Sequence, residues 1–129
     1  MSDRKSIVVE GFGHGKLPIP AASRIGPFVA SGNIFGFDYT AGAHPDTAEE
    51  QAALMFNYVR LVIEGAGGTL DDILKITVYI RNDSVRAAID QHWLEAFPHE
   101  ASRPARQAIL LEAMPGNRLV ACDFLAVID

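Results

Sequence analysis

The stretch Ile73-Leu74-Lys75-Ile76-Thr77-Val78-Tyr79-Ile80-Arg81 alternates apolar and polar side chains. One face would carry Leu74, Ile76, Val78 and Ile80, and the other would carry Lys75, Thr77, Tyr79 and Arg81. Such alternation is typical of a strand in a sheet that is covered by helices on one face only. The sequence around it must therefore supply helices for the apolar face and further strands beside it.

Two helix-like segments flank this strand. Residues 47–66 open with a capping-box pattern, carry apolar side chains at helical spacing, and are followed by Gly67-Gly68. Residues 84–97 show a second helical pattern, with Asp83 as the expected N-cap and Pro98 just past the end. Their apolar stripes predict two helices packed on the same sheet.

The remaining strand-like segments are residues 6–9, 22–25, 28–31, 106–111 and 119–128, while 32–45 reads as a connecting loop. The order predicts an α+β fold, a two-layer sandwich of a mostly antiparallel or mixed sheet with two helices on one face. The last strand is apolar on both sides except at Asp123. The open face should then be buried against other copies of the chain, which predicts a closed homo-oligomer.

Composition narrows the class of protein. The length of 129 residues predicts one domain spanning residues 1–129, and the formal net charge of -5 makes nucleic acid an unlikely partner. Cys122 is the only cysteine, so no internal disulfide can form. The charged first residues and the absence of a long apolar run predict neither a signal peptide nor a membrane span, and hence a cytoplasmic protein.

The segment Arg103-Pro104-Ala105-Arg106 leads into a strand. Pro104 bars a helix here and favours an extended Arg103, so Arg106 should enter the strand in a fixed direction. A guanidinium held in this way can bind a carboxylate through two parallel hydrogen bonds. Two interpretations stay open for Arg106: a salt-bridge or rim residue, or an anchor for a small carboxylate ligand.

Several segments together resemble the reactive-intermediate deaminase (Rid) family, also called YjgF-like or L-PSP endoribonucleases. They are Val29-Ala30-Ser31-Gly32, residues 62–69, residues 71–80 and Arg103-Pro104-Ala105-Arg106, and the similarity runs from about Ile19 to the C-terminus. The resemblance implies a chorismate-mutase-like fold and a homotrimer with a central barrel, whose ligand pockets lie in clefts between subunits. It also implies hydrolysis of reactive enamines or imines to 2-keto acids and ammonia, without metal or organic cofactor. Arg106 would bind the substrate carboxylate and Ser31 would lie in the same pocket.

The chain departs from this family in its last strand, which reads Val120-Ala121-Cys122-Asp123-Phe124. Family members that are deaminases carry a water-activating glutamate where Ala121 stands. Asp123, His14 and Glu112 are the candidate replacements, with Asp123 on the same strand face as Ala121. His14 lies in a glycine-rich segment that lacks the spacing of a phosphate-binding loop.

Cys122 should point into the helix-covered core, which favours a structural role over a nucleophilic one. Tyr79 and Trp93 are interpreted as packing residues, Tyr79 at a subunit interface. Three functions remain open: an enamine or imine deaminase, a trimeric binder of a small carboxylate metabolite without turnover, and a ribonuclease or translation inhibitor. The net negative charge weakens the third.

Overall fold

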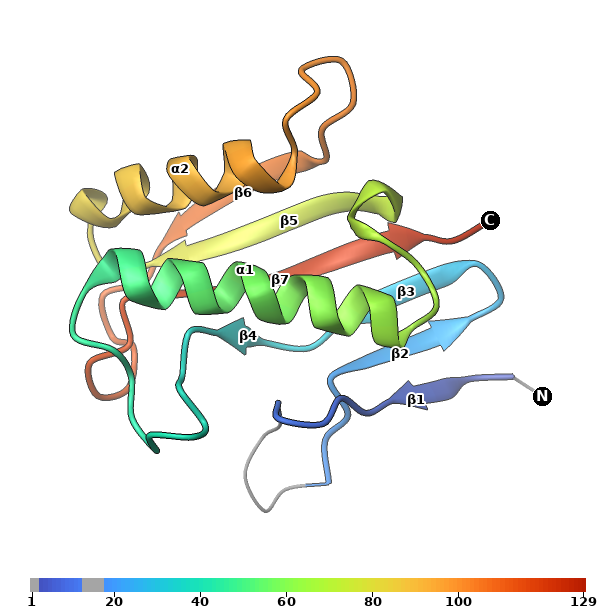
Figure 1. The fold of residues 1–129 in the computed structure, drawn as a ribbon, viewed down its shortest axis with the longest axis horizontal. Coiled ribbons are helices and arrows are strands. Elements are labelled where there is room, and N and C mark those ends of the chain that lie inside the picture. Colours follow the sequence, from blue (N-terminus) through green and yellow to red (C-terminus); the bar gives the residue numbers. More distant parts are fainter. Residues whose placement is uncertain (1–2, 13–17) are drawn as a thin grey trace.

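The computed structural model describes residues 3–12 and 18–129. Within them, two helices lie on one face of a seven-stranded sheet with the order β1-β2-β3-β7-β5-β6, in which β4 also pairs with β7 (Figure 1). The strands are β1 Lys5–Ile7, β2 Ala22–Ile25, β3 Phe28–Ser31, β4 Ile34–Phe35, β5 Ile73–Ile80, β6 Ala105–Leu110 and β7 Val120–Val127. The helices are α1 Ala48–Gly65 and α2 Arg86–Ala96, each preceded or followed by a short 3₁₀ turn, η1 Leu70–Asp72 and η2 Asp83–Val85. The predicted α+β class with a mixed sheet and two helices on one face is confirmed.

The first helix begins and ends where its sequence predicts. Thr47 accepts a hydrogen bond from the backbone N–H of Glu50 and caps the N-terminus of α1. At the other end Gly67 adopts a positive φ of 97°, and Gly68 donates to the carbonyl of Ile63. This is the left-handed C-terminal cap that favours glycine, and it turns the chain towards β5.

Strand β7 lies at the centre of the sheet between β3 and β5, both antiparallel to it. Among the strand pairs of the described residues, β5 and β6 alone are parallel, because α2 carries the chain back over the sheet between them. The core-facing side chains of β5 and β7 and the inner face of α1 are buried. Burial of each such aliphatic side chain stabilises the fold by about 1.5–3 kcal/mol. The apolar layer between α1 and the sheet therefore holds these two elements together.

Three local predictions were wrong. Leu74 is 61% exposed and does not face the core, because a register shift between Ile73 and Lys75 changes the alternation at the start of β5. The second helix begins at Arg86, after a 3₁₀ turn whose cap is Asn82 and not Asp83. The expected connecting loop after residue 31 contains β4, a strand of two residues that is too short to give a periodic signal.

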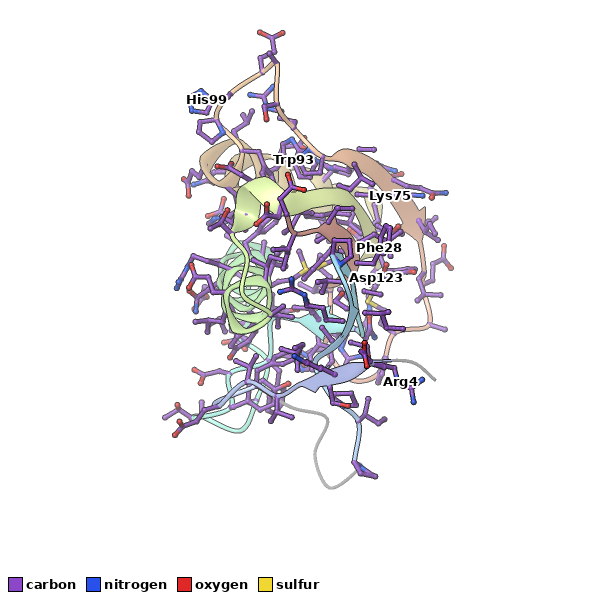
Figure 2. The ribbon with its side chains drawn as sticks, turned by 90° about the vertical axis from the view of Figure 1, so that its right-hand side faces the viewer. Arg4, Phe28, Lys75, Trp93, His99 and Asp123 are labelled. Atoms are coloured by element: carbon purple, nitrogen blue, oxygen red, sulfur yellow. The ribbon has the colours of Figure 1, made fainter. Side chains whose placement is uncertain are left out.

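The open face of the sheet carries an apolar surface. Its side chains line a shallow cavity of about 310 Å³ formed by Ser23, Ile25, Phe28, Val29, Ala30, Leu74, Leu125, Ala126 and Val127. Figure 2 shows the two layers edge on, with Lys75 and Asp123 on the side of the sheet away from the helices. Phe28 is 64% exposed and Leu125 51%, so this face presents large apolar side chains to its surroundings, as the sequence of the last strand predicts. None of the described helices is long and apolar enough to cross a lipid bilayer.

Candidate functional site

The segment that forms β3 and β4 interrupts its pairing with β7 opposite the middle of that strand. It pairs with β7 up to Ala30 and rejoins β7 at Ile34. At the break, the Ser31 hydroxyl accepts a hydrogen bond from the backbone N–H of Phe124 at 2.8 Å and donates to the carbonyl of Gly32 at 2.9 Å. The serine thus replaces the missing ladder bond, and the backbone turns away from β7 without leaving a buried amide unpaired.

A tyrosine–aspartate pair lies beside this break on the open face of the sheet. Tyr79 of β5 donates its phenolic hydrogen to Oδ2 of Asp123 of β7 at 2.9 Å. That hydrogen bond, followed by burial, raises the pKa of Tyr79 above its ordinary value, so the phenol remains a donor at neutral pH. Oδ1 of Asp123 makes no hydrogen bond to any described residue. One carboxylate oxygen is therefore oriented and the other is available to a ligand or a water molecule.

The loop between β6 and β7 is fixed by a buried glutamine of α1. Gln51 is fully buried. Its Nε2 donates to the carbonyls of Pro45 and Asn117, each at 2.9 Å, and its Oε1 accepts from the backbone N–H of Leu119 at 2.9 Å. Asn117 and Leu119 are the chain neighbours of Arg118, so this amide holds the backbone on both sides of the arginine.

A second side chain holds the same loop from the end of β5. Nη2 of Arg81 donates to the carbonyl of Gly116 at 2.7 Å and also to the carbonyl of Met114. Nε of Arg81 is buried and has no partner among the described residues. Hydrogen bonds to a charged group are worth about 1.5–3 kcal/mol each, so the loop has a defined conformation.

Arg118 projects from this loop over an aromatic ring. Its guanidinium carbon lies 3.7 Å from the centre of the Phe35 ring, and its Nε lies 3.4 Å from Nε2 of His44, which can accept a weak hydrogen bond. Burial, followed by the charges of Arg118 and Arg81, lowers the pKa of His44 below its ordinary value, so this imidazole is neutral at pH 7. Burial also lowers the pKa of Arg118, although an arginine stays charged in proteins. In the described parts of the chain, no carboxylate forms an ion pair with Arg118.

Ser31, the Tyr79–Asp123 pair and Arg118 lie around one cavity of about 420 Å³, a volume suited to a small-molecule ligand. Its lining is formed by Ser31, Gly32, Asn33, Tyr79, Leu111, Ala113, Met114, Pro115, Arg118, Ala121 and Asp123. Among the described residues, the cavity lining therefore presents one cation, one anion, a phenol and the polar side chains of Ser31 and Asn33 beside apolar side chains. Such a lining can bind a small polar molecule and move a proton at the carboxylate.

The structure brings three of the predicted site residues together. Ser31, Ala121 and Asp123 all line this cavity. Ala121 is 3% exposed and contributes only a methyl group, so Asp123 is the one carboxylate in the lining. Tyr79, interpreted from the sequence as a packing residue, also lines the cavity and positions Asp123.

Arg106 lies elsewhere in the single chain. It pairs in register with the buried Ile76, which places it on the helix side of the sheet. Its Nη2 lies 2.7 Å from Oδ1 of Asp90, and its guanidinium lies 5.3 Å from the centre of the Trp93 ring. In the single chain, Arg106 therefore forms a salt bridge, which is the first of its two interpretations. It does not line the cavity. Its role as a carboxylate anchor stays a prediction.

The other candidates have separate positions. Glu112 is exposed beside the cavity and is not part of its lining, and His14 lies outside the described residues. Cys122 is fully buried in the core, as predicted, and burial raises the pKa of its thiol. Among residues 3–12 and 18–129, no group of three or more His, Cys, Asp or Glu side chains could hold a metal ion.

Sequence reasoning missed Arg118 and His44. The period-two pattern of β5 and β7 places Tyr79 and Asp123 on one face, so the sequence pattern could have predicted that they contact each other. Arg118 lies in an irregular loop, and His44 is 74 residues away from it along the chain. No local pattern marks a contact of that separation.

Known proteins resemble this chain over most of its length. The sequence profile of the family described as Endoribonuclease L-PSP matches residues 20–128. A RutC family protein of Pyrococcus abyssi is 28% identical over 116 residues, covering 82% of this chain and 90% of the relative. A 2-iminobutanoate/2-iminopropanoate deaminase of Escherichia coli strain K12 is 28% identical over 118 residues, covering 83% of this chain and 91% of the relative. The crystal structure of E. coli TdcF with bound serine superposes with a TM-score of 0.87 at 23% identity, covering 97% of this chain and 99% of that one, and so shows the same fold.

Proposed function

Because the chain belongs to the endoribonuclease L-PSP family, we propose that its cavity hydrolyses small imino acids, or the enamines in equilibrium with them, to 2-oxo acids and ammonia. The observation that carries this proposal is the hydrogen-bonded Tyr79–Asp123 pair in a cavity that also holds Arg118. A relative that is named a 2-iminobutanoate/2-iminopropanoate deaminase supports the same class of reaction.

The reaction needs a base, an electrophile and water. In its protonated form the imine is an iminium, which is already a strong electrophile. Oδ1 of Asp123 accepts a proton from water while the water oxygen bonds to the imine carbon and the C=N π electrons move to nitrogen. The carbinolamine then takes that proton on nitrogen, and its C–N bond breaks as ammonia leaves. At the same time the carbinolamine hydroxyl gives its proton to the Asp123 carboxylate and becomes the carbonyl, and Asp123 releases this proton, which balances the one that made the imine an iminium, to ammonia or water. The balance is one imine and one water consumed, and one 2-oxo acid and one ammonia formed.

Tyr79 is a positioning residue in this scheme. Its hydroxyl fixes Oδ2 of Asp123 and leaves Oδ1 directed to the reactants. Because the pKa of Tyr79 is raised, the phenol keeps its hydrogen over the neutral range and does not compete for the water proton. Holding the iminium beside a water molecule supplies a further part of the rate.

The assembly belongs to the same proposal. The apolar surface around Phe28 and Leu125 supports self-association of the open sheet face. A homotrimer with a central barrel would bury this surface and place the cavity beside a neighbouring subunit. Arg106 could take part in binding only if Asp90 released it in such an assembly, since the two side chains are paired in the single chain.

A trapping assay tests the reaction. An L-amino-acid oxidase generates the imino acid, and semicarbazide competes with hydrolysis by capturing it as a semicarbazone. Wild-type protein should lower the rate of semicarbazone formation in proportion to its concentration, and heat-denatured protein should not. If semicarbazone forms at the same rate at every protein concentration and pH, the deaminase proposal is wrong.

Binding without turnover is the second candidate, and Ala121 is the observation that favours it. A methyl group stands where the family resemblance implies a water-activating glutamate. A protein that binds a 2-oxo acid but leaves semicarbazone formation unchanged would be such a binder. Ribonuclease activity is disfavoured by the net charge of -5.

A further inference from the structure

One contact beside the cavity joins two separate segments of the chain. His44 lies between β4 and α1, and Arg118 lies in the loop between β6 and β7. Nε2 of His44 is 3.4 Å from Nε of Arg118. The imidazole packs against the rings of Phe35 and Phe37, with ring centres 6.1 and 5.0 Å away, and the Arg118 guanidinium carbon lies 3.7 Å from the centre of the same Phe35 ring. The two side chains therefore share one aromatic support.

This contact requires an unprotonated Nε2 on His44. A guanidinium nitrogen can only donate a hydrogen bond, so the imidazole nitrogen must accept it. A protonated imidazole carries a hydrogen on both nitrogens and cannot accept. The two side chains would then be cations with nitrogens 3.4 Å apart. Protonation of one nitrogen thus changes an attractive contact into a repulsive one.

Positive charge faces His44 from two elements. Arg118 comes from the β6–β7 loop and Arg81 follows the end of β5, and after burial their charges are the causes that lower the pKa of His44. Neither arginine forms an ion pair with a carboxylate of the described residues. A proton added to this imidazole therefore meets two uncompensated cations.

The acidic groups nearest to His44 in the chain do not offset this charge. Asp38 accepts hydrogen bonds from its neighbouring amides, those of residues 40 and 41, and Asp46 is exposed. The other titratable groups of these segments, Tyr39 and Tyr58, are phenols. In the part of the chain that the structure describes, no carboxylate forms an ion pair with His44, Asp123 of β7 included.

We propose that His44 and Arg118 form a pH-sensitive latch on the cavity wall: when His44 takes up a proton, the Arg118 guanidinium leaves it and turns into the cavity, towards Asp123. Asp123 is the one carboxylate in the described lining, and its Oδ1 has no hydrogen-bond partner among the described residues. The cavity is then open while His44 is neutral and closed while it is charged. The latch concerns the shape of the cavity and does not depend on the reaction proposed for it.

The backbone beside both members of the latch is held by one side chain. Nε2 of Gln51 donates to the carbonyl of Pro45, next to His44, and to that of Asn117, next to Arg118. Its Oε1 accepts from the amide of Leu119 on the other side of Arg118. The movement is therefore confined to side-chain rotamers, and it reverses when the proton is lost.

Methyl NMR of protein labelled with [13C-methyl]methionine tests the latch without any ligand. Met114 lines the cavity, whereas Met55 is fully buried in the core and serves as the internal control. In wild-type protein the Met114 methyl resonance should shift at the same midpoint as the His44 imidazole resonance, below pH 6.5, and the Met55 resonance should not. His44→Gln keeps an acceptor for Arg118 but cannot be protonated, so this step should disappear.

A soluble nitroxide reports the direction of the movement. Paramagnetic broadening of the Met114 methyl by the nitroxide should decrease as His44 becomes protonated, because Arg118 then closes the cavity. An increase in broadening at that midpoint would overturn the proposed closure.

Arg118→Gln tests the same coupling from the other member. Loss of the neighbouring cation should raise the midpoint of the His44 imidazole resonance, because a like charge no longer opposes protonation. His99, exposed before β6, should keep its midpoint. The Met114 methyl should no longer follow His44 in this variant. Circular dichroism and thermal melting establish that both variants are folded.

The latch is overturned if the Met114 methyl does not shift at the His44 midpoint, if that step persists in His44→Gln, or if Arg118→Gln leaves the His44 midpoint unchanged. Any of these results in a protein that hydrolyses imino acids would remove the latch and leave the proposed function. A working latch in a protein without hydrolysis would keep the latch and remove the deaminase.

Discussion

Replacing Gln51 with leucine should destabilise the protein by about 3 kcal/mol. The change removes three partly buried hydrogen bonds of a fully buried side chain, two to the carbonyls of Pro45 and Asn117 and one from the amide of Leu119. Each neutral hydrogen bond contributes about 1 kcal/mol, and the backbone groups lose their partners when the amide is removed. For a chain of 129 residues this corresponds to a fall in Tm of about 10 °C.

Urea denaturation followed by circular dichroism measures this loss, at one fixed protein concentration because self-association adds to apparent stability. Gln91→Leu is the matched control, since Gln91 is exposed on α2 and its replacement should change stability by less than about 0.5 kcal/mol. Hydrogen exchange adds a local readout: the amide of Leu119 should exchange faster in Gln51→Leu. If Gln51→Leu loses less than about 1 kcal/mol and the Leu119 amide stays protected, the loop is not held by this glutamine.

The other predictions concern pH, assembly and the buried thiol. The folded-state pKa of His44 is lowered from 6.5, so below about pH 6.5 the unfolded chain binds more protons than the folded chain. The free energy of unfolding should therefore fall as the pH drops through that value. His44→Gln should flatten this dependence of the denaturation midpoint on pH, and an unchanged dependence would contradict the assignment. Phe28→Asp should reduce the molar mass measured by light scattering to that of a monomer. Leu94→Asp should not reduce it, because Leu94 lies on the outer face of α2 and is 53% exposed. Equal molar masses for the two variants would refute the interface. Cys122 should resist alkylation in the native protein because it is buried and its pKa is raised, and modification at the rate of a free thiol, read by mass spectrometry, would contradict this.

The layers of the fold could be predicted because they depend on repeated local signals. The cap at Thr47, the alternation through β5 and the apolar helix faces each point to the same two-layer arrangement. Elements without such a signal were missed. The strand β4 is held by its pairing with β7 and not by its own pattern, and the exposure of Leu74 follows from a register shift that depends on β7.

The site was predictable only in part, for the same physical reason. Ser31, Ala121 and Asp123 lie on strands that the pattern and the family resemblance identify together. Arg106 is placed by its register with Ile76 and by Asp90 of α2, and neither contact can be derived from the residues around it. The position of Arg118 depends on Gln51 of α1, which bonds to the backbone of its two chain neighbours, Asn117 and Leu119, and nothing in the helix sequence around Gln51 marks it for this role.

The most direct test of the catalytic assignment is kcat/KM for imino acid hydrolysis by Asp123→Asn. Asparagine keeps the shape and can still accept the hydrogen bond from Tyr79, but it cannot take a proton from water. Removal of a general base lowers the rate by about 100- to 10,000-fold. Asp46→Asn is the same change at an exposed position outside the cavity. It should leave kcat/KM within a factor of about 3 of the wild-type value. A fall of about 100-fold or more in Asp123→Asn alone is the predicted result, and a folded Asp123→Asn protein as active as wild type would contradict the assignment of chemistry to this cavity.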